Sequence, residues 1–401
     1  MIKILNKKII SGILAAALSG SLFFPAVTSA EIKTYTGEGE YIMSDFETPE
    51  VAKQRAKLYA ERNAQEQAGV YIGSYSKMEN FNLVADEIVT ITNGILKILD
   101  VAYKIVPMTE YNGIMYRATV LANIDTDKID EWITKGVAER SSLVAKNNEL
   151  QKQIEEQEKQ IAELKKQIAQ KKSPKAEEKL KENFAEADRN FMSMIKLEEG
   201  DRLNLVIADW AYAEAVKCWT EAIELNPNNY LAYESRGYYF NLMEVGRYEE
   251  AISDFTNAIK LHPSAENYFF RGTAYLSTDR RNLAQKDFET AIKLDSNYSA
   301  PYGELAYIYA TSGNRKYLQT AIDFADKAIT FNYKNWRAYY SRGLAFYMQD
   351  DFASALRDAQ LALEYGCGDA YQLIGDCYAK LGLTEEAEKY WELAKDPPAF
   401  G

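Results

Sequence analysis

The segment from Trp210 to Lys395 repeats one pattern six times, and this pattern constrains the fold more than any other feature of the sequence. Each copy has residues at positions i, i+4 and i+7, with alanine at both outer positions. This spacing places the three side chains on one face of a helix, where small residues allow a second helix to approach closely. The triplets are Ala215, Trp219, Ala222; Ala251, Phe255, Ala258; Ala284, Phe288, Ala291; Ala321, Ala325, Ala328; Ala355, Ala359, Ala362; and Ala387, Trp391, Ala394.

The approaching helix is predicted upstream of the last five copies. There a tyrosine is followed four residues later by a small residue and three residues further by an aromatic one. These are Tyr233, Gly237, Phe240; Tyr268, Gly272, Tyr275; Tyr302, Ala306, Tyr309; Tyr339, Gly343, Phe346; and Tyr371, Gly375, Tyr378. The small residues lie 35, 34, 37 and 32 positions apart, close to the period of about 34 residues of one class of helix–turn–helix repeats. The sequence therefore predicts a mostly α-helical chain with a solenoid of about six hairpins over residues 174–401.

Residues 233–263 and 339–363 resemble the tetratricopeptide repeat, with an aromatic–Gly–aromatic first helix and an alanine-rich second helix. Pro227 and Pro263 stand where this family often closes its second helix. The first copy departs from the pattern. Its first helix is expected to carry Phe184, Ala187, Phe191 and Ile195, and residues 200–206 are expected to form an enlarged loop. The resemblance implies protein or peptide binding and no reaction.

The resemblance also implies which residues line the concave face, because the family groove uses first-helix positions next to the core positions. In this sequence the implied peptide-binding residues are Glu234, Tyr238, Asn241, Phe269, Thr273, Tyr307, Arg337, Tyr340, Tyr347, Gln372 and Asp376. Tyrosine and arginine are well suited to anchor a peptide. The alternative is that several of the aromatic residues pack between neighbouring repeats. The Lys and Asn pairs with which some family members hold a C-terminal carboxylate are absent from these positions, so no such clamp is predicted.

Residues 138–173 are rich in Glu, Lys and Gln, and their apolar residues follow a heptad pattern. The predicted seam consists of Leu143, Asn147, Leu150, Ile154, Ile161, Leu164 and Ile168. Ile at a positions with Leu at d positions favours a parallel two-stranded coiled coil, which predicts a homodimer. The alternative is a single exposed helix with Glu–Lys pairs.

The first 137 residues contain two further units. Residues 1–30 have lysines, an apolar stretch and a small-residue site at Ala30, which predicts a signal peptide and an exported protein of the periplasm, cell envelope or outside. Residues 31–137 predict a small α+β domain: a strand at 32–42, a helix from Thr48 with alanine at every fourth position, and a hairpin around Asn112-Gly113. The motif YTGEGEY, the alanine helix and the hairpin resemble the amino-terminal domain of small envelope lipoproteins and the flagellar T-ring assembly protein. That resemblance implies envelope assembly without catalysis.

Composition argues against most other functions. The net charge is −12 with no basic block, so nucleic acid is not an expected partner. After the first thirty residues no stretch is long and apolar enough to span a membrane. There is one histidine, His262, and there are three cysteines without Cys-x-x-Cys spacing, so we predict no metal, no cofactor and no catalytic site. Because no polar-faced capping helix follows the sixth copy, we also expect its apolar side to pack against a partner or a second subunit.

Two functions remain after these exclusions. The first is an exported adaptor, not an enzyme, that binds proteins through its repeats. The alternative is a structural spacer or cell-surface scaffold whose solenoid has no groove ligand.

Overall fold

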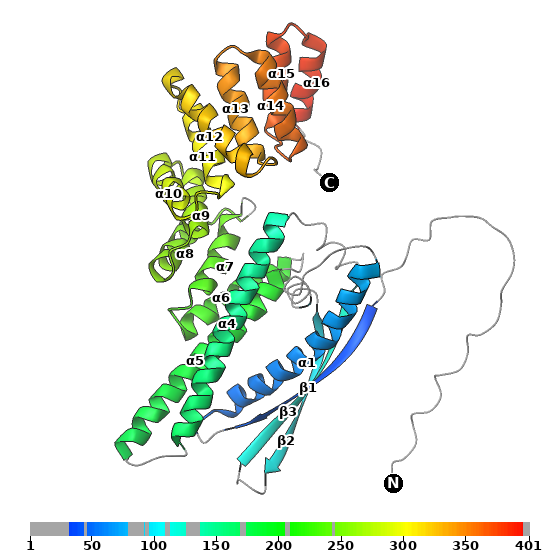
Figure 1. Ribbon diagram of the computed structural model, residues 1–401, viewed down its shortest axis with the longest axis vertical. Coiled ribbons are helices and arrows are strands. Elements are labelled where there is room, and N and C mark those ends of the chain that lie inside the picture. Colours follow the sequence, from blue (N-terminus) through cyan, green and yellow to red (C-terminus); the bar gives the residue numbers. More distant parts are fainter. Residues whose placement is uncertain are drawn as a thin grey trace, which may run out of the picture.

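The computed structural model describes residues 32–43, 46–78, 92, 96–108, 113–125, 137–168, 174–204, 209–242 and 245–395. It has a small sheet with one long helix near the N-terminus, followed by helices that stack in sequence towards the C-terminus (Figure 1). The mostly α-helical class predicted from the repeats is confirmed. Within the described ranges, no helix has both the length and the apolar character that crossing a membrane requires.

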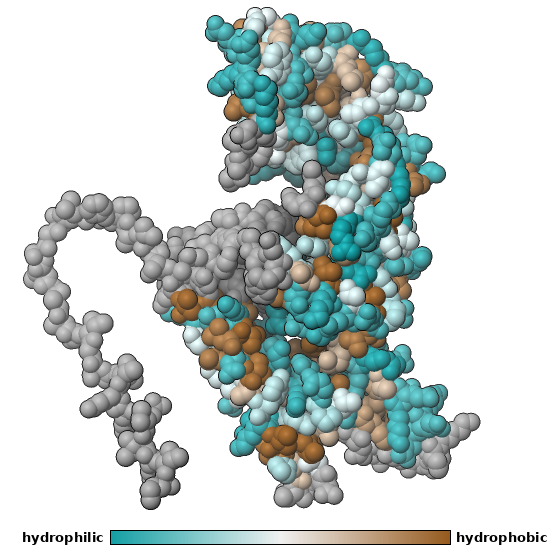
Figure 2. Space-filling model, turned by 180° about the vertical axis from the view of Figure 1, so that it is seen from behind, coloured by the Kyte–Doolittle hydropathy of each residue, from teal (hydrophilic) through white to brown (hydrophobic). Residues whose placement is uncertain are grey.

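The N-terminal unit is an antiparallel sheet covered by a helix. Strands β1 (Ile32–Ile42), β2 (Lys97–Met108) and β3 (Gly113–Asp125) have the spatial order β1-β3-β2. The strand predicted at 32–42 and the pairing of the two hairpin strands are both present, while Asn112 lies outside the described residues. The resemblance of this unit to envelope lipoproteins stays a prediction. Its sheet exposes apolar side chains such as Ile32, Leu99 and Ile105. In Figure 2 brown patches lie over this end of the molecule, whereas much of the helical surface is teal.

Small residues on both partners let helix α1 (Pro49–Met78) lie directly on strand β1. The alanine stripe is fully buried and consists of Ala52, Ala56, Ala60, Ala64 and Ala68. A Cβ atom added to Gly37 would lie 2.0 Å from the Ala60 carbonyl oxygen, and one on Gly39 would lie 2.3 Å from the Ala60 nitrogen. Only glycine fits this contact. The helix begins as predicted, with the Thr48 hydroxyl accepting a hydrogen bond from the Val51 amide at 3.3 Å.

Helix α4 (Val137–Ile168) contains the predicted coiled-coil seam, and it packs against its own chain. Ile154 is fully buried in a cluster with residues of α1 and α5 (Pro174–Asn204), including Leu58 and Phe191. Leu164 is buried with Leu180 and other residues of α5. These two seam positions are therefore covered by helices of the same chain and not by a second copy. The side chains of the other seam residues lie outside the described part of α4.

A buried arginine joins the N-terminal unit to the first repeat. Arg55 of α1 has 4 % of its side chain exposed; its Nη2 donates to Asp188 Oδ1 of α5 at 3.2 Å. Its Nη1 lies 3.3 Å from Glu47 Oε1 and donates to the Tyr41 hydroxyl at 3.1 Å. The guanidinium also lies 4.5 Å from the centre of the Phe191 ring. A second pair, Arg62 of α1 with Glu158 of α4 at 3.1 Å, joins α1 to α4. The N-terminal unit, α4 and the first repeat thus share ion pairs and a core.

The solenoid follows as six antiparallel helix pairs that alternate first and second helices. The pairs are α5 with α6 (Asp209–Leu225); α7 (Tyr230–Asn241) with α8 (Tyr248–Leu261); α9 (Ala265–Ser277) with α10 (Arg281–Leu294); α11 (Ser299–Ala310) with α12 (Leu318–Phe331), preceded by the short 3₁₀ helix η1 (Arg315–Tyr317); α13 (Trp336–Met348) with α14 (Phe352–Glu364); and α15 (Ala370–Lys380) with α16 (Thr384–Lys395). The alanines of the first five triplets are fully buried. The hairpins predicted from the triplets are confirmed.

The enlarged loop predicted at residues 200–206 is wrong, because α5 continues to Asn204 and contains Gly200. Gly200 allows the close approach of Trp219: an added Cβ would lie 2.6 Å from the indole Nε1. The indole donates to Asp201 Oδ1 at 2.9 Å. The sixth repeat has the same arrangement, with Gly375 against Trp391 and the indole donating to Asp376 Oδ1 at 2.8 Å. The first repeat therefore has the small residue that appeared to be missing.

The last helix presents charge where the earlier second helices present apolar residues. In earlier repeats, the residue that follows the first alanine of the triplet packs on the next hairpin, as Ile252 and Ile322 do. In α16 the corresponding outward positions hold Glu388, Glu392 and Lys395, which are exposed. The outward side of α16 is therefore more charged than expected, although Leu381 and Leu383 before it are exposed. The packing of the sixth repeat against a partner or a second subunit stays a prediction.

The three cysteines give a prediction that tests the packing of the repeats. Cys218, Cys367 and Cys377 are all buried and unpaired, and burial raises their pKa values to about 11, 11 and 12. Because the thiolate is the reactive form, we expect the native thiols to react with an aromatic disulfide reagent at pH 8 at least tenfold more slowly than in the unfolded chain. The release of coloured thiolate, followed with and without guanidinium, measures this. Rapid reaction of any thiol in the native protein would contradict the packing described.

Candidate functional site: the first-helix face

The eleven predicted binding residues lie on α7, α9, α11, α13 and α15, the first helices of repeats two to six. Neighbouring first helices touch one another, since α7 contacts α9, and α13 contacts both α11 and α15. We call these eleven residues, with Glu266, Glu304 and Asp369, the first-helix face.

The centre of the first-helix face is a stack of rings around one guanidinium. The Arg337 guanidinium lies 4.6 Å from the Tyr307 ring centre and 4.4 Å from that of Trp336. The Tyr307 and Tyr340 rings stack with their centres 6.4 Å apart. Burial, with Asp369 nearby, raises the pKa of Tyr340 to about 12. The packing of α11 beside α13 thus brings together three of the predicted residues.

Glu304 of α11 is the buried partner of this arginine. Arg337 Nε donates to Glu304 Oε1 at 2.9 Å, and the glutamate is 7 % exposed. Its other oxygen, Oε2, is buried and accepts no hydrogen bond from the residues that the structure describes. Burial is the main cause that raises the pKa of Glu304. Because Oε2 is itself buried, it is closed to a ligand in this arrangement, and the role of Glu304 is to hold the Arg337 guanidinium in place.

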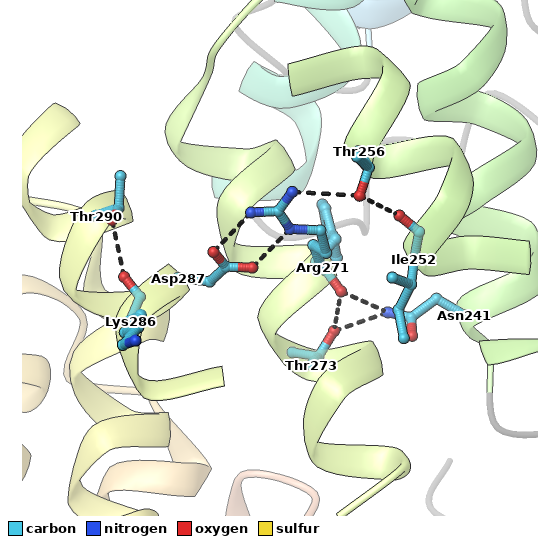
Figure 3. Close-up of polar contacts among 9 residues, drawn as sticks. Asn241, Ile252, Thr256, Arg271, Thr273, Lys286, Asp287 and Thr290 are labelled. Carbon is cyan, nitrogen blue, oxygen red and sulfur yellow. Dashed lines mark hydrogen bonds and ion pairs between the residues drawn. The ribbon is translucent and has the colours of Figure 1, made fainter. Parts of the chain in front are cut away.

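In repeats two and three, several of the predicted binding residues make hydrogen bonds or ring contacts with other residues of the chain. Asn267 donates to Glu234 Oε1 at 2.6 Å. Asn241 donates to the Thr273 hydroxyl at 2.7 Å, as Figure 3 shows. Phe269 lies between the rings of Phe288 and Tyr298, with centres 5.8 and 5.3 Å away, and so packs between neighbouring repeats. Tyr238 differs, because 45 % of it is exposed. In this part of the face the chain itself occupies most of the predicted contacts.

Repeats five and six place two predicted residues near carboxylates. The Tyr347 ring packs edge-on against Phe352 at 5.5 Å, and burial with Asp376 nearby raises the Tyr347 pKa. Asp376 accepts hydrogen bonds from Trp391 and, at 2.9 Å, from Gln372. Both bonds end on Oδ1, which leaves Oδ2 without a donor within the described residues. Gln372 and Asp376 are therefore partly used to hold the sixth repeat together.

Sequence reasoning missed two exposed acids at the position that Arg337 occupies in repeat five. This position lies six residues before the small residue of the first helix, and Glu266 and Asp369 fill it in repeats three and six. Both are exposed, and neither carboxylate makes a hydrogen bond or an ion pair within the described residues. Counting back from Gly272 and Gly375 would have found them.

Sequence reasoning also missed an Arg–Asp pair that repeats three times. Arg271 holds Asp287 through two hydrogen bonds of 2.7 and 2.8 Å and donates to the Thr256 hydroxyl of the preceding repeat at 3.2 Å (Figure 3). Arg236 with Asp254 and Arg342 with Asp358 repeat this geometry. In each pair the arginine precedes the glycine of the first helix, and the aspartate precedes the middle residue of the triplet. These pairs join helices and are not exposed binding groups.

The first-helix face offers aromatic rings, carboxylates and one arginine, which are groups suited to noncovalent contacts. Among the residues that the structure describes, no group of three or more His, Cys, Asp or Glu side chains could hold a metal ion. Noncovalent recognition is the chemistry that these side chains support.

Comparison with known proteins agrees with the repeat architecture. Residues 265–298 and 368–396, the third and sixth hairpins, match the family model of the tetratricopeptide repeat. The chain is 29 % identical over 137 residues to tetratricopeptide repeat protein 6 of Homo sapiens, covering 34 % of this chain and 25 % of that protein. It is 25 % identical over 186 residues to anaphase-promoting complex subunit 3 of Schizosaccharomyces pombe, covering 46 % and 27 %. The chain thus spans about a quarter of the length of these relatives.

Among solved structures, the APC/C hetero-tetramer Cut9-Hcn1 is similar with a TM-score of 0.45 and 19 % identity, covering 52 % of this chain and 40 % of that one. The family match and the relatives support the assignment of tetratricopeptide repeats to the solenoid, and proteins with such repeats generally serve protein–protein interaction.

Proposed function

We propose that this protein is an adaptor without enzymatic activity, and that it binds a segment of a partner protein on the first-helix face. The observation that carries the proposal is the stack in which the Tyr307 ring contacts both the Tyr340 ring and the Arg337 guanidinium, which Glu304 holds in place. Tyrosine and arginine are the residue types that most often dominate binding energy at interfaces. Their arrangement across two neighbouring first helices suits an extended segment that crosses the repeats.

The test is whether substitutions on the first-helix face reduce the amount of a partner protein that the full chain captures. In the full chain, Tyr307→Ala with Tyr340→Ala should lower recovery of the partner at least tenfold, because hot-spot truncations cost about 2 kcal/mol or more. Affinity capture with quantitative mass spectrometry measures recovery. Tyr333→Ala is the matched control, since this tyrosine is 63 % exposed in the loop before α13 and should keep the partner. Equal recovery with the double variant would contradict the proposal.

The second candidate function is a structural spacer. The contacts of Glu234, Asn241 and Phe269 with the chain's own residues favour it, because they leave less of the face for a ligand. A spacer should yield no partner whose recovery depends on Tyr307 and Tyr340.

Export to the periplasm, cell envelope or outside is part of the proposal and is supported by the lysines and apolar stretch of residues 1–30. Fusion of these residues to a reporter enzyme that is active only outside the cytoplasm tests it.

The homodimer through α4 is also still a prediction. Ile154 and Leu164 are already covered by the same chain, so a dimer would need other residues of the seam. Light scattering that gives the mass of one chain would exclude it.

A further inference from the structure

The sheet of the N-terminal unit has two edges, and helix α1 protects only one of them. Because the strand order is β1-β3-β2, the edge strands are β1 and β2 (Figure 1). On β1, the Thr36 carbonyl accepts a hydrogen bond from Gln67 of α1 at 3.0 Å. The Glu38 N–H donates to Asn63 Oδ1 of the same helix at 3.3 Å. Within the described residues, α1 packs on β1 and β3, whereas β2 packs extensively only with β3. The edge of β2 is therefore the one that can accept a further strand.

The hydrogen bonds on β1 also show which backbone groups of β2 point outward. The two β1 residues that bond α1 turn their backbone groups away from β3, and in an antiparallel ladder this direction alternates from residue to residue. Carried across β3 through the strand register, the alternation turns the N–H and C=O groups of Val101, Tyr103 and Ile105 away from the sheet. The Val101 N–H agrees with this direction, since it donates to the side-chain oxygen Oδ1 of Asp100 at 2.9 Å.

The side chains of β2 alternate between an apolar and a charged set. Those of residues 101, 103 and 105 lie on the face that α1 covers elsewhere in the sheet, because their partners on β3 are buried in the core with α1. Tyr103 and Ile105 are nevertheless exposed, since α1 does not extend over β2. The opposite face of β2 carries Asp100, Ala102 and Lys104, which are all exposed.

We propose that the edge of β2 pairs with β2 of a second copy of this chain, antiparallel about a two-fold axis at Ala102. The two three-stranded sheets then become one continuous sheet. In this register Asp100 of each copy lies opposite Lys104 of the other, and Val101 lies opposite Tyr103. Opposite charges and aromatic–β-branched pairs are favourable neighbours across strands.

Charge complementarity selects both the register and the occupant. A shift of two residues in either direction loses both charge pairs, because neither Asp100 nor Lys104 then lies opposite a charge. The two charges lie at equal distances on either side of Ala102, which is the arrangement that a two-fold interface between identical strands requires. A strand of another protein would not need this symmetry.

The backbone groups are consistent with this pairing. The outward groups of Val101 in one copy meet those of Tyr103 in the other, so the two central pairs form a ladder. The Val101 N–H exchanges the Asp100 oxygen for a backbone carbonyl, which leaves the carboxylate to its charge pair. Pro107 limits the ladder at one end, since it has no N–H, and proline inside a strand is typical of sheet edges.

A disulfide tests the register in the full chain. Ala102→Cys places two thiols on the two-fold axis in a pair without backbone hydrogen bonds, where the α-carbons are about 4.5 Å apart, within the range for a disulfide. Mild oxidation should give a covalent dimer on a non-reducing gel about tenfold faster, or more, than with Thr34→Cys, which exposes a thiol on the same face at the β1 edge. The native cysteines are buried. Equal rates for the two variants would overturn the inference.

Charge exchange tests the same pairs by light scattering over a dilution series, in which the native chain should have the mass of two chains and dissociate on dilution. Lys104→Asp and Asp100→Lys each place like charges opposite one another and should weaken the dimer by about tenfold or more, whereas the double variant should restore it. The single variants change the net charge in opposite directions, so a net-charge effect cannot weaken both dimers.

Lys97→Asp is the matched control. It reverses an exposed charge near the start of β2 that faces no charge in the proposed register, so the dimer should persist. A native chain with the mass of one chain at every concentration would overturn the inference. A dimer that neither single exchange weakens would overturn it as well and would point to another surface. The inference does not depend on the adaptor function, which the partner-capture test decides separately.

Discussion

Replacing Arg55 by alanine is expected to destabilise the protein by about 3–5 kcal/mol, because it removes the cation from a buried charge cluster. Glu47 has none of its side chain exposed, and Asp188 has 10 % exposed. Both carboxylates would lose this partner in a low-dielectric environment. The pKa of Tyr41 in the same cluster is raised, first by burial and also by Glu47, so the phenol stays neutral and cannot replace the cation's role. Urea unfolding followed by circular dichroism measures the loss.

A matched control separates this effect from the loss of any ion pair on the N-terminal unit. Arg117 of β3 is paired with Glu40 of β1, and 38 % and 48 % of their side chains are exposed. Exposed pairs contribute about 1 kcal/mol or less, so Arg117→Ala should shift the unfolding midpoint only slightly. If the two variants lost the same stability, the buried cluster would not be what joins α1 to α5.

Trp219→Ala is the second substitution expected to have a large effect, about 3–5 kcal/mol, since the side chain is fully buried. Its loss leaves a cavity against Gly200 and removes the indole hydrogen bond to Asp201. The first repeat also packs against α4, so the damage should reach the N-terminal unit. Hydrogen exchange should show loss of protection in α5, α6 and α4 together.

Trp391→Ala tests the same geometry at the other end of the solenoid. Trp391 meets Gly375 and Asp376 in the same way, but it is partly exposed. Each repeat of a solenoid contacts only its neighbours, so exchange should increase mainly in α15 and α16. Loss of protection throughout the molecule after Trp391→Ala would contradict this local effect.

The repeats could be predicted because their signal is local. The alanines of the second helices recur at helical spacing in every copy. A glycine in the first helix, together with a phenylalanine or tryptophan in the second helix, indicates that the two helices pack closely. The misplaced loop at Gly200 has a simple cause: Lys196 and Leu203 stand where the later first helices have a tyrosine and a second aromatic residue, so the motif was not recognised. The packing of α4 could not be predicted in the same way. A heptad seam predicts that an apolar face of the helix is covered. It does not identify α1 and α5 as the helices that cover it.

The arrangement of the first-helix face could be predicted only in part. Positions next to the core follow from the register of the first helices, which is why Tyr307, Arg337 and Tyr340 are found together. Whether such a residue is used by the chain itself depends on residues about 33 positions away, as for Glu234 with Asn267. The pairing of Arg337 with Glu304 has the same origin. Such contacts depend on how neighbouring hairpins are rotated, which the sequence pattern does not reveal.

The Arg–Asp pairs divide the solenoid into stiff blocks. Arg236 and Arg271 also reach threonines of the preceding repeat, and Arg342 reaches Asp326, so repeats one to three are clamped together and so are repeats four and five. Repeat four has Leu305 and Phe324 at the positions of the pair, and repeat six has Ile374 and Tyr390. The junctions before these two repeats therefore lack the Arg–Asp clamp and have single hydrogen bonds to hydroxyl groups instead, from Arg281 and Gln285 to Thr311 and Tyr309 and from Gln360 to Tyr378. Bending of the superhelix should concentrate there, and the Tyr307–Tyr340 stack belongs to a block that can tilt as a unit between the two joints.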